Sequence, residues 1–274
     1  MPELPEIETL LRGLKAEKII GASIVDVRIF CQRLEQKEDK NLETTLVGAQ
    51  ITALSRRGKY LILHLSKQKL LAIHLRMSGR ILLQKAGAYQ DRYDRAIITL
   101  STGIQLHFHD VRRFGTLSII QDEKSFFSKL GMEPLSEQCT QEAFERGLQS
   151  SSMIKCLLLK QQFLAGIGNI YADEALFQAK VHPMRKASSL TKPERLNLFQ
   201  AIQEVLKKGI EHNGTSLGSG RLNFHSVNGK TGKNQQTLLV YGKKGLPCAR
   251  CQHPIERVRV QQRSSHFCPV CQRL

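Results

Sequence analysis

Apolar residues at helical spacing predict a helix near the start of the chain. Pro5 suits the first turn of a helix, where no backbone donor is lost, and Glu6 and Glu8 complement the positive end of the helix dipole. The apolar positions that would anchor this helix are Ile7, Leu10, Leu11 and Leu14.

Between about residues 20 and 120 the pattern changes to short strand-like segments. These segments are apolar or alternating, and polar or glycine-containing breaks separate them. The clearest ones are residues 60–65, 70–75, 96–100 and 104–109. Several short strands at this spacing predict a β-sandwich.

Helical periodicity replaces the strand pattern from about residue 129. Residues 141–148 and 153–160 predict short helices, and a longer one begins at the glycine-rich turn 166–169. A glycine turn that opens a helix presents unpaired backbone N–H groups, which can bind an anion. Thr191 and Glu194 then form a capping box ahead of an amphipathic helix. The segment after that helix, residues 215–236, is rich in Gly, Ser, Asn and Lys, and we expect a mobile loop of unusual length.

The last thirty residues contain the strongest motif in the chain. Two Cys-x2-Cys pairs stand sixteen residues apart, which is the spacing of a tetrahedral structural zinc site with four thiolate ligands. The ligands are Cys248, Cys251, Cys268 and Cys271. Alternation over residues 255–261, followed by a turn at 262–265, predicts a β-hairpin. So short a module cannot bury enough surface to fold alone, and we expect one Zn²⁺ to supply the missing stability.

Charge indicates the partner. The formal net charge is +17 and the sequence pI is about 9.8, which favours a polyanion over a small neutral substrate. Hydrophobic residues make up 41% of the chain, as in an ordinary globular protein. No signal-peptide pattern and no run of eighteen apolar residues occurs, so we expect a cytoplasmic protein without a membrane partner. Seven cysteines, an odd number, argue against a disulfide framework.

The first two residues suggest a nucleophile. Met1 precedes a small residue and should be removed, which would leave Pro2 as a free secondary amine able to form an iminium with an aldehyde-level carbon. An α-amino group has a pKa near 8, so about a tenth of it is neutral at pH 7. Glu3 beside it could move protons. The alternative is that these residues only begin a helix.

Three basic clusters interrupt the predicted strands, at residues 56–59, 74–79 and 109–115. Each is loop-like, and together they combine cations with apolar or aromatic side chains. Cations can hold phosphates, while an apolar side chain can enter a base stack. Each cluster alone is equally compatible with a solvated turn.

The opening Met-Pro-Glu-Leu-Pro-Glu-Ile-Glu and the string Gly-Ile-Gly-Asn-Ile-Tyr-Ala-Asp-Glu from residue 166 resemble the formamidopyrimidine-DNA glycosylases. The likeness spans essentially the whole chain. It implies an α+β fold: a β-sandwich flanked by an N-terminal helix, a helix-two-turn-helix domain, and a zinc-stabilised β-hairpin. The domains would be residues 1–128 (catalytic), 129–235 (helix-two-turn-helix with a lesion-capping loop) and 236–274 (zinc finger).

The same resemblance implies roles for individual residues. Pro2 would be the nucleophile and Glu3 a proton donor, and Lys59 and Arg263 would assist elimination. The implied DNA contacts are His74 and Asn169 at phosphates, Met77, Arg112 and Phe114 in the space left by an extruded base, Lys155 near the damaged base, and Tyr93, where histidine is more usual. The capping loop at Arg221–His225 departs from the family's usual wording, which bears on lesion preference.

The implied function is base-excision repair: a bifunctional glycosylase and lyase that removes 8-oxoguanine and formamidopyrimidines and cleaves the abasic site by β,δ-elimination. Its partner would be double-stranded DNA containing a damaged base, and the enzyme would be a nucleoid-associated monomer. Two alternatives stay open. One is an endonuclease VIII-like glycosylase for oxidised pyrimidines, and the other is a non-enzymatic zinc-ribbon protein that binds nucleic acid.

Overall fold

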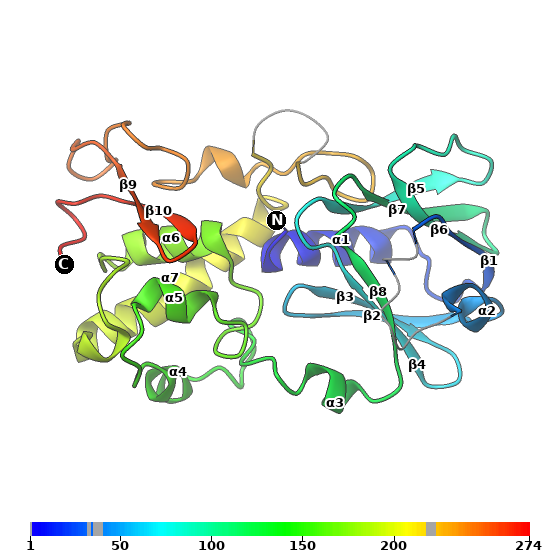
Figure 1. Ribbon diagram of the computed structural model, residues 1–274, viewed down its shortest axis with the longest axis horizontal. Helices are drawn as coiled ribbons and strands as arrows, with labels where there is room; N and C mark the ends of the chain where they lie inside the picture. The colour runs from blue at the N-terminus through cyan, green and yellow to red at the C-terminus, as the bar shows by residue number, and fades with distance from the viewer. Residues whose placement is uncertain (1, 32–33, 35–40, 218–222) are drawn as a thin grey trace. The chain divides into compact units, whose positions relative to one another are not determined.

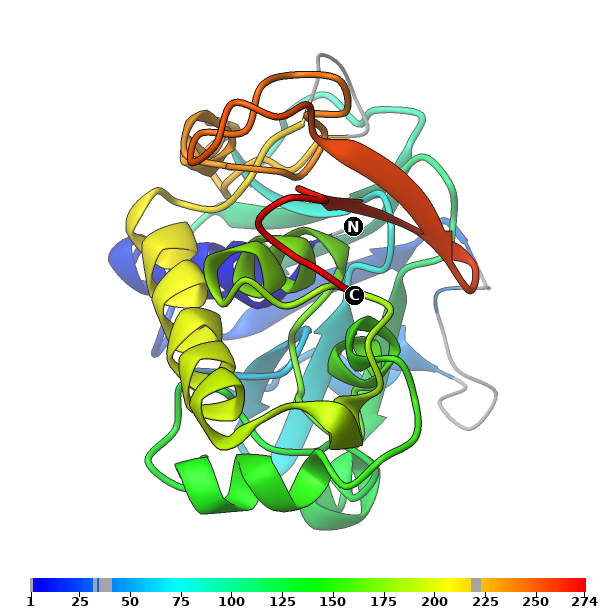
Figure 2. The same ribbon diagram turned by 90° about the vertical axis from the view of Figure 1, so that its left-hand side faces the viewer.

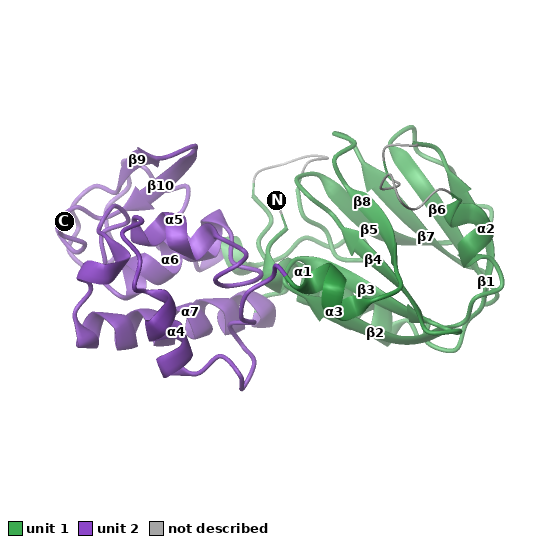
Figure 3. Ribbon diagram, turned by 60° about the horizontal axis from the view of Figure 1, so that its bottom comes forward, with its two compact units in different colours: residues 1–128, 212–235 green, residues 129–211, 236–274 purple. Residues whose placement is uncertain are grey.

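A computed structural model describes residues 2–31, 34, 41–217 and 223–274. The chain divides into two compact units (Figure 3): unit 1 comprises Met1–Ser128 and His212–Gln235, and unit 2 comprises Lys129–Glu211 and Gln236–Leu274. These units differ from the three predicted domains, because residues 212–235 pack with the N-terminal segment and the C-terminal module packs with the helices. The boundaries of three separate domains stay a prediction.

Unit 1 contains two four-stranded antiparallel sheets, with strand orders β1-β6-β7-β5 and β2-β3-β4-β8 (Figure 1). The predicted sandwich is confirmed. The strands are β1 (Ile24–Ile29), β2 (Ile51–Arg57), β3 (Tyr60–Leu65), β4 (Lys69–His74), β5 (Gly79–Lys85), β6 (Asp94–Leu100), β7 (Ile104–Asp110) and β8 (Thr116–Ile120).

The N-terminal helix α1 (Leu4–Ala16) supplies part of the core of unit 1. Leu10 and Leu14 are fully buried, as their helical spacing predicts. The other face of the helix carries Glu8, whose carboxylate pairs with Arg56 of β2 at 3.2 Å. Two short helices, α2 (Leu42–Leu46) and α3 (Glu123–Phe127), complete the unit.

Unit 2 begins with the helices α4 (Gln141–Gly147), α5 (Ile154–Leu159), α6 (Asn169–Gln178) and α7 (Lys192–Glu211), with a 3-10 turn at Ala187–Ser189 and another at Asn234–Gln236 on the border with unit 1. The capping box of α7 is confirmed: the Thr191 N–H donates to the Glu194 carboxylate at 2.8 Å. Gly209 lets α7 approach α6, because a Cβ there would lie 2.5 Å from the ring of Tyr171. No described helix is long and apolar enough to cross a membrane.

The C-terminal hairpin of unit 2 consists of β9 (Glu256–Val260) and β10 (Arg263–Phe267), and it packs on α6 (Figure 2). Its turn is shorter than predicted. Residues 262–265 were expected to form the turn, but Arg263 already pairs with Val260 in the ladder. The turn is therefore made by Gln261, which has a positive φ of 52°, and Gln262.

Candidate active site and metal centre

Pro2 and Glu3 are buried at the N-terminal end of α1. The carboxylate of Glu6 fixes this end: it accepts the Glu3 N–H at 2.7 Å and, with its other oxygen, the Thr215 N–H at 2.7 Å. Sequence analysis gave Glu6 only a role in the helix dipole. Its contact with Thr215 joins residues 209 positions apart, and no local pattern signals it. Met1 lies outside the described residues, so its removal stays a prediction.

Lys59 and His74 lie on adjacent strand ends, because Tyr60 of β3 pairs with His74 of β4. Burial, followed by the charges of Arg76 and Lys59, lowers the pKa of His74 to about 3. The ring is therefore neutral at pH 7. Its Nδ1 accepts the Arg76 N–H at 3.0 Å, so the ring proton sits on Nε2. His74 is thus a neutral donor, a suitable partner for a phosphate oxygen.

The predicted base-stack residues Met77, Arg112 and Phe114 stand on two loops of unit 1, and all three are exposed. Met77 is 42% and Phe114 48% exposed, which is unusual for large apolar side chains and marks a contact surface. The Arg112 guanidinium lies 5.0 Å from the centre of the Phe114 ring. The two loops are linked, since the Arg112 N–H donates to the hydroxyl of Ser78, the residue after Met77, at 3.2 Å.

Tyr93 rests on a buried polar cluster. Its ring meets that of His109 edge-on at 5.6 Å, and the Arg95 guanidinium lies 5.7 Å from its centre. Beneath it, Asp94 contacts His107 at 2.8 Å and His109 at 3.4 Å. Burial alone would raise the pKa of Asp94, but the hydrogen bonds from both histidines lower it well below its usual range. Tyr93 is thus held firmly, and its contact with DNA stays a prediction.

In unit 2, the glycine-rich turn opens α6 as predicted. Gly166 has a φ of 97°, a left-handed conformation that favours glycine, and its N–H donates to the side chain of Gln161 at 2.9 Å. The Oδ1 atom of Asn169, the first residue of α6, is buried and has no hydrogen-bond partner among the described residues. Rotation of that amide by 180° would place its NH₂ there, as a donor beside the helix N-terminus.

Lys155 does not present its charge to solvent. The side chain is fully buried, and its ammonium donates to the Asp173 carboxylate at 2.5 Å and to the Ser264 carbonyl at 2.7 Å. Asp173 also accepts the Ser265 hydroxyl at 2.9 Å and the His266 N–H at 2.8 Å. The expectation that Lys155 contacts DNA beside the damaged base is therefore corrected for this structure, because the ammonium instead binds the strand that carries Arg263.

Arg263 is exposed, as its predicted role requires, and its strand is held from below. The neighbouring acid on α6, Glu174, fastens the chain that leads to the hairpin: its carboxylate accepts the N–H groups of Leu239, Val240 and Tyr241 at 2.8 to 2.9 Å. Burial raises the pKa of Glu174 although these three hydrogen bonds act in the opposite direction. Two consecutive acids of α6 thus hold the C-terminal module, a function that their sequence does not reveal.

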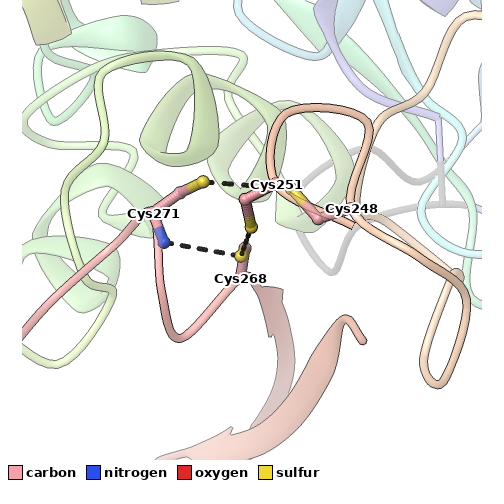
Figure 4. A group of neighbouring side chains, drawn as sticks. All are labelled: Cys248, Cys251, Cys268 and Cys271. Atoms are coloured by element: carbon pink, nitrogen blue, oxygen red, sulfur yellow. Dashed lines mark hydrogen bonds between the residues drawn. The ribbon is translucent and has the colours of Figure 1, made fainter. Parts of the chain in front are cut away.

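The four cysteines converge as their spacing predicts (Figure 4). Their sulfur atoms all lie within 4.8 Å of one another. The Cys248–Cys271 and Cys251–Cys268 sulfur pairs are 4.0 and 3.4 Å apart. Thiolates bound tetrahedrally to zinc at about 2.3 Å would be about 3.8 Å apart, so the cluster fits one structural Zn²⁺. The module is joined to the helices by Gln272, whose amide donates to the Val181 carbonyl at 2.9 Å.

Family models match three successive parts of the chain. The N-terminal domain of formamidopyrimidine-DNA glycosylase matches residues 1–117, and the helix-two-turn-helix domain of the same enzyme matches residues 130–220. A zinc finger found in this enzyme and in IleRS matches residues 245–274. The third match confirms the C-terminal module as a zinc finger.

Curated relatives and solved structures agree with these models over the full chain. The formamidopyrimidine-DNA glycosylases of Herpetosiphon aurantiacus and Protochlamydia amoebophila are 42% and 40% identical, and each alignment covers at least 99% of both chains. The Lactococcus lactis enzyme bound to DNA with an abasic site is 36% identical, with a TM-score of 0.91 over 99% of this chain and 100% of that one. A variant of that enzyme bound to DNA containing Fapy-dG is 37% identical, with a TM-score of 0.92 over 100% of both chains. The chain belongs to the formamidopyrimidine-DNA glycosylase family.

Proposed function

We propose that this protein is a bifunctional DNA glycosylase and abasic-site lyase of base-excision repair, acting on oxidised purines in double-stranded DNA. The observation that carries the proposal is the buried N-terminal Pro2–Glu3 pair, anchored by Glu6, in a chain of this family. The net charge of +17 suits a polyanionic substrate. The Lactococcus lactis relatives were solved with abasic and Fapy-dG DNA.

In the proposed reaction, the Pro2 nitrogen bonds to C1′ of the damaged nucleotide as the base leaves with the electrons of the glycosidic bond. Glu3 donates a proton to the ring oxygen O4′, the sugar opens, and an iminium joins Pro2 to C1′. The positive nitrogen acidifies the C2′ hydrogens. Loss of one of them expels the 3′ phosphate, and a second elimination expels the 5′ phosphate. Lys59 and Arg263 would carry the later proton transfers.

The remaining side chains would bind and open the duplex. A base inside a helix is unreachable, so the target nucleotide must be turned out while the backbone is held. Lys59 and the neutral donor His74 would hold phosphates from unit 1, and Asn169 and Arg263 from unit 2. Met77, Arg112 and Phe114 would fill the vacated space, and Tyr93 would contact the DNA. Zn²⁺ would take no part in the chemistry, because it would serve to keep the hairpin folded.

Borohydride trapping tests the nucleophile. Reduction turns the iminium into a stable amine, so the wild type should form a covalent adduct with duplex DNA containing 8-oxoguanine. The Pro2→Gly variant should lose most of this adduct, whereas Pro5→Ala, which changes a proline of the same helix without touching the amine, should keep it. A wild type that cleaves no strand and forms no adduct would support the zinc-ribbon binder instead.

A mass spectrum of the purified protein shows whether Met1 has been removed. The proposal requires a mass without that methionine in the active fraction. If Met1 stays on and the protein still cleaves DNA with undiminished adduct formation, Pro2 is not the nucleophile.

Lesion preference separates the proposal from the endonuclease VIII-like alternative. Duplexes with 8-oxoguanine should be nicked faster than duplexes with thymine glycol, and the reverse order would favour the alternative. The capping segment bears on this choice. Arg221 and Leu222 lie outside the described residues, while Phe224 is buried and its carbonyl accepts the Ser216 hydroxyl at 2.6 Å. We also propose that the enzyme acts as a monomer, which sedimentation at micromolar concentration would test.

A further inference from the structure

Asp110, the last residue of β7, is a fully buried carboxylate that no step of the proposed chemistry uses. Both of its oxygens face the loop that follows it. One accepts the N–H groups of Phe114 and Gly115, each at 2.8 Å. The other accepts the Arg112 N–H at 3.1 Å and the Ser78 hydroxyl at 2.5 Å. A buried charge with this many donors fixes the backbone around it.

These four donors belong to two separate loops. Arg112, Phe114 and Gly115 follow Asp110 directly, whereas Ser78 stands 32 residues earlier, next to Met77. The Arg112 N–H also donates to Ser78 at 3.2 Å, so the hydroxyl and the carboxylate form one junction between the loops. The junction therefore joins the exposed residues Met77, Arg112 and Phe114 into one unit.

The backbone around Asp110 leaves little freedom for another arrangement. A Cβ on Gly115 would lie 2.4 Å from the Phe108 ring and 3.2 Å from the Asp110 carboxylate, so glycine permits this close approach. Arg76 and Arg113, one in each loop, both have positive φ angles of 52° and 59°. Such left-handed conformations are costly for arginine and persist where the surroundings impose them.

We propose that Asp110 is a positioning residue for base extrusion: it holds both loops in the arrangement in which Met77, Arg112 and Phe114 enter the base stack together. This inference rests on the proposed function. Inserting side chains into a stack costs unstacking energy, and a wedge that is already ordered does not add the cost of ordering its loops. Asp110 would therefore act before the bond-breaking steps and would touch neither the sugar nor the base.

The inference predicts a difference between two substrates. A duplex with 8-oxoguanine requires a stacked base to be turned out, whereas a duplex with a preformed abasic site has no base at that position. Asp110→Ala should slow single-turnover cleavage of the 8-oxoguanine duplex on the order of 10- to 100-fold. Cleavage of the abasic duplex should fall by less than about threefold, because the iminium chemistry does not depend on the wedge. A general loss of folding would slow both reactions alike.

Two further variants keep the test decisive if Asp110→Ala folds poorly. Ser78→Ala removes the link between the loops but leaves the carboxylate and its bonds to Phe114 and Gly115, so it should show the same substrate difference at smaller size. Ser118→Ala replaces another buried serine of unit 1, on β8, and should alter neither rate. Thermal unfolding of each variant identifies those that are folded at the assay temperature.

Fluorescence of 2-aminopurine next to the lesion reports unstacking directly. The rapid rise expected with the wild type should be slower with Ser78→Ala and unchanged with Ser118→Ala. Equal slowing on both substrates, or wild-type behaviour of the folded Asp110 and Ser78 variants, would overturn the inference. If the wild type itself cleaves neither substrate, it is the proposed function that fails.

Discussion

In unit 1, Arg112 and Phe114 stand at the end of a sandwich with a large apolar core, whereas in unit 2, Arg263 begins a hairpin with a small core beneath it. The buried cluster under that hairpin comprises Phe177, Val240, Cys248, Ile255 and Cys268. Rigid presentation of a cation is thus achieved in two ways. Unit 1 relies mainly on apolar burial, with carboxylates that order its loops, while unit 2 relies on a metal cluster and on two acids of α6.

The difference teaches how each region should fail. An apolar core loses stability in proportion to the buried volume removed. A polar clamp fails when one partner is deleted, because the other is left buried without compensation. A metal module fails as a whole, since its folding free energy is metal-binding free energy.

Loss of a zinc ligand should have the largest effect. Structural zinc contributes about 10–16 kcal/mol of apparent binding free energy in small zinc-finger modules. Cys268→Ala should reduce the zinc content below one ion per chain and abolish strand cleavage, because Arg263 lies on the strand that ends next to this ligand. Cys139→Ala, at a buried thiol of unit 2 outside the cluster, should change neither zinc content nor cleavage. A Cys268→Ala protein with full zinc and full activity would contradict the metal assignment.

Breaking the acid clamp should come second. Asp173→Asn leaves the fully buried Lys155 ammonium without its ion-pair partner, and such a loss costs about 3–5 kcal/mol. Urea denaturation of the single variant and of Lys155→Met/Asp173→Asn measures this cost. The double variant should recover part of the lost stability, since it leaves no uncompensated charge. A single variant as stable as the wild type would show that the clamp does not hold the hairpin.

Truncation in the core of unit 1 should follow. Leu10 is fully buried in α1, so Leu10→Ala should lower the free energy of unfolding by about 2–5 kcal/mol while the zinc content stays at one ion. Arg12→Ala on the exposed face of the same helix removes only a surface ion pair and should cost less than about 1 kcal/mol. Zinc loss in Leu10→Ala would mean that the two foundations are not independent.

The smallest expected effect is a pH dependence in unit 1. His74 has a folded-state pKa of about 3 against an ordinary value of 6.5, so the folded protein binds fewer protons between these values. The stability it contributes is fully present above pH 6.5 and is lost as the pH falls toward 3, by at most about 1.4 kcal/mol per pH unit. Urea denaturation between pH 7.5 and 5 should give a shallower slope for His74→Gln. Identical slopes would contradict the assignment.

Local patterns predicted much of the fold. The apolar spacing of α1, the capping box of α7 and the alternation in β3 and β7 all involve neighbours a few residues apart, so the sequence displays them directly. The strands β1, β2, β5 and β8 were not identified individually. β2 ends in Arg56 and Arg57, which the sequence pattern assigned to a basic loop, and β1 acquires its strand structure by pairing with β6, some seventy residues later.

The sequence by itself determined the cysteine cluster, the helix at the N-terminus and the family likeness, because spacing and residue type carry that information. Only the tertiary structure decided what holds these parts. The partners Glu6 and Thr215, Ser78 and Asp110, and Lys155 and Asp173 meet across 209, 32 and 18 positions. A buried carboxylate looks like any other acid in the sequence, and its role depends on which donors the folded chain brings to it.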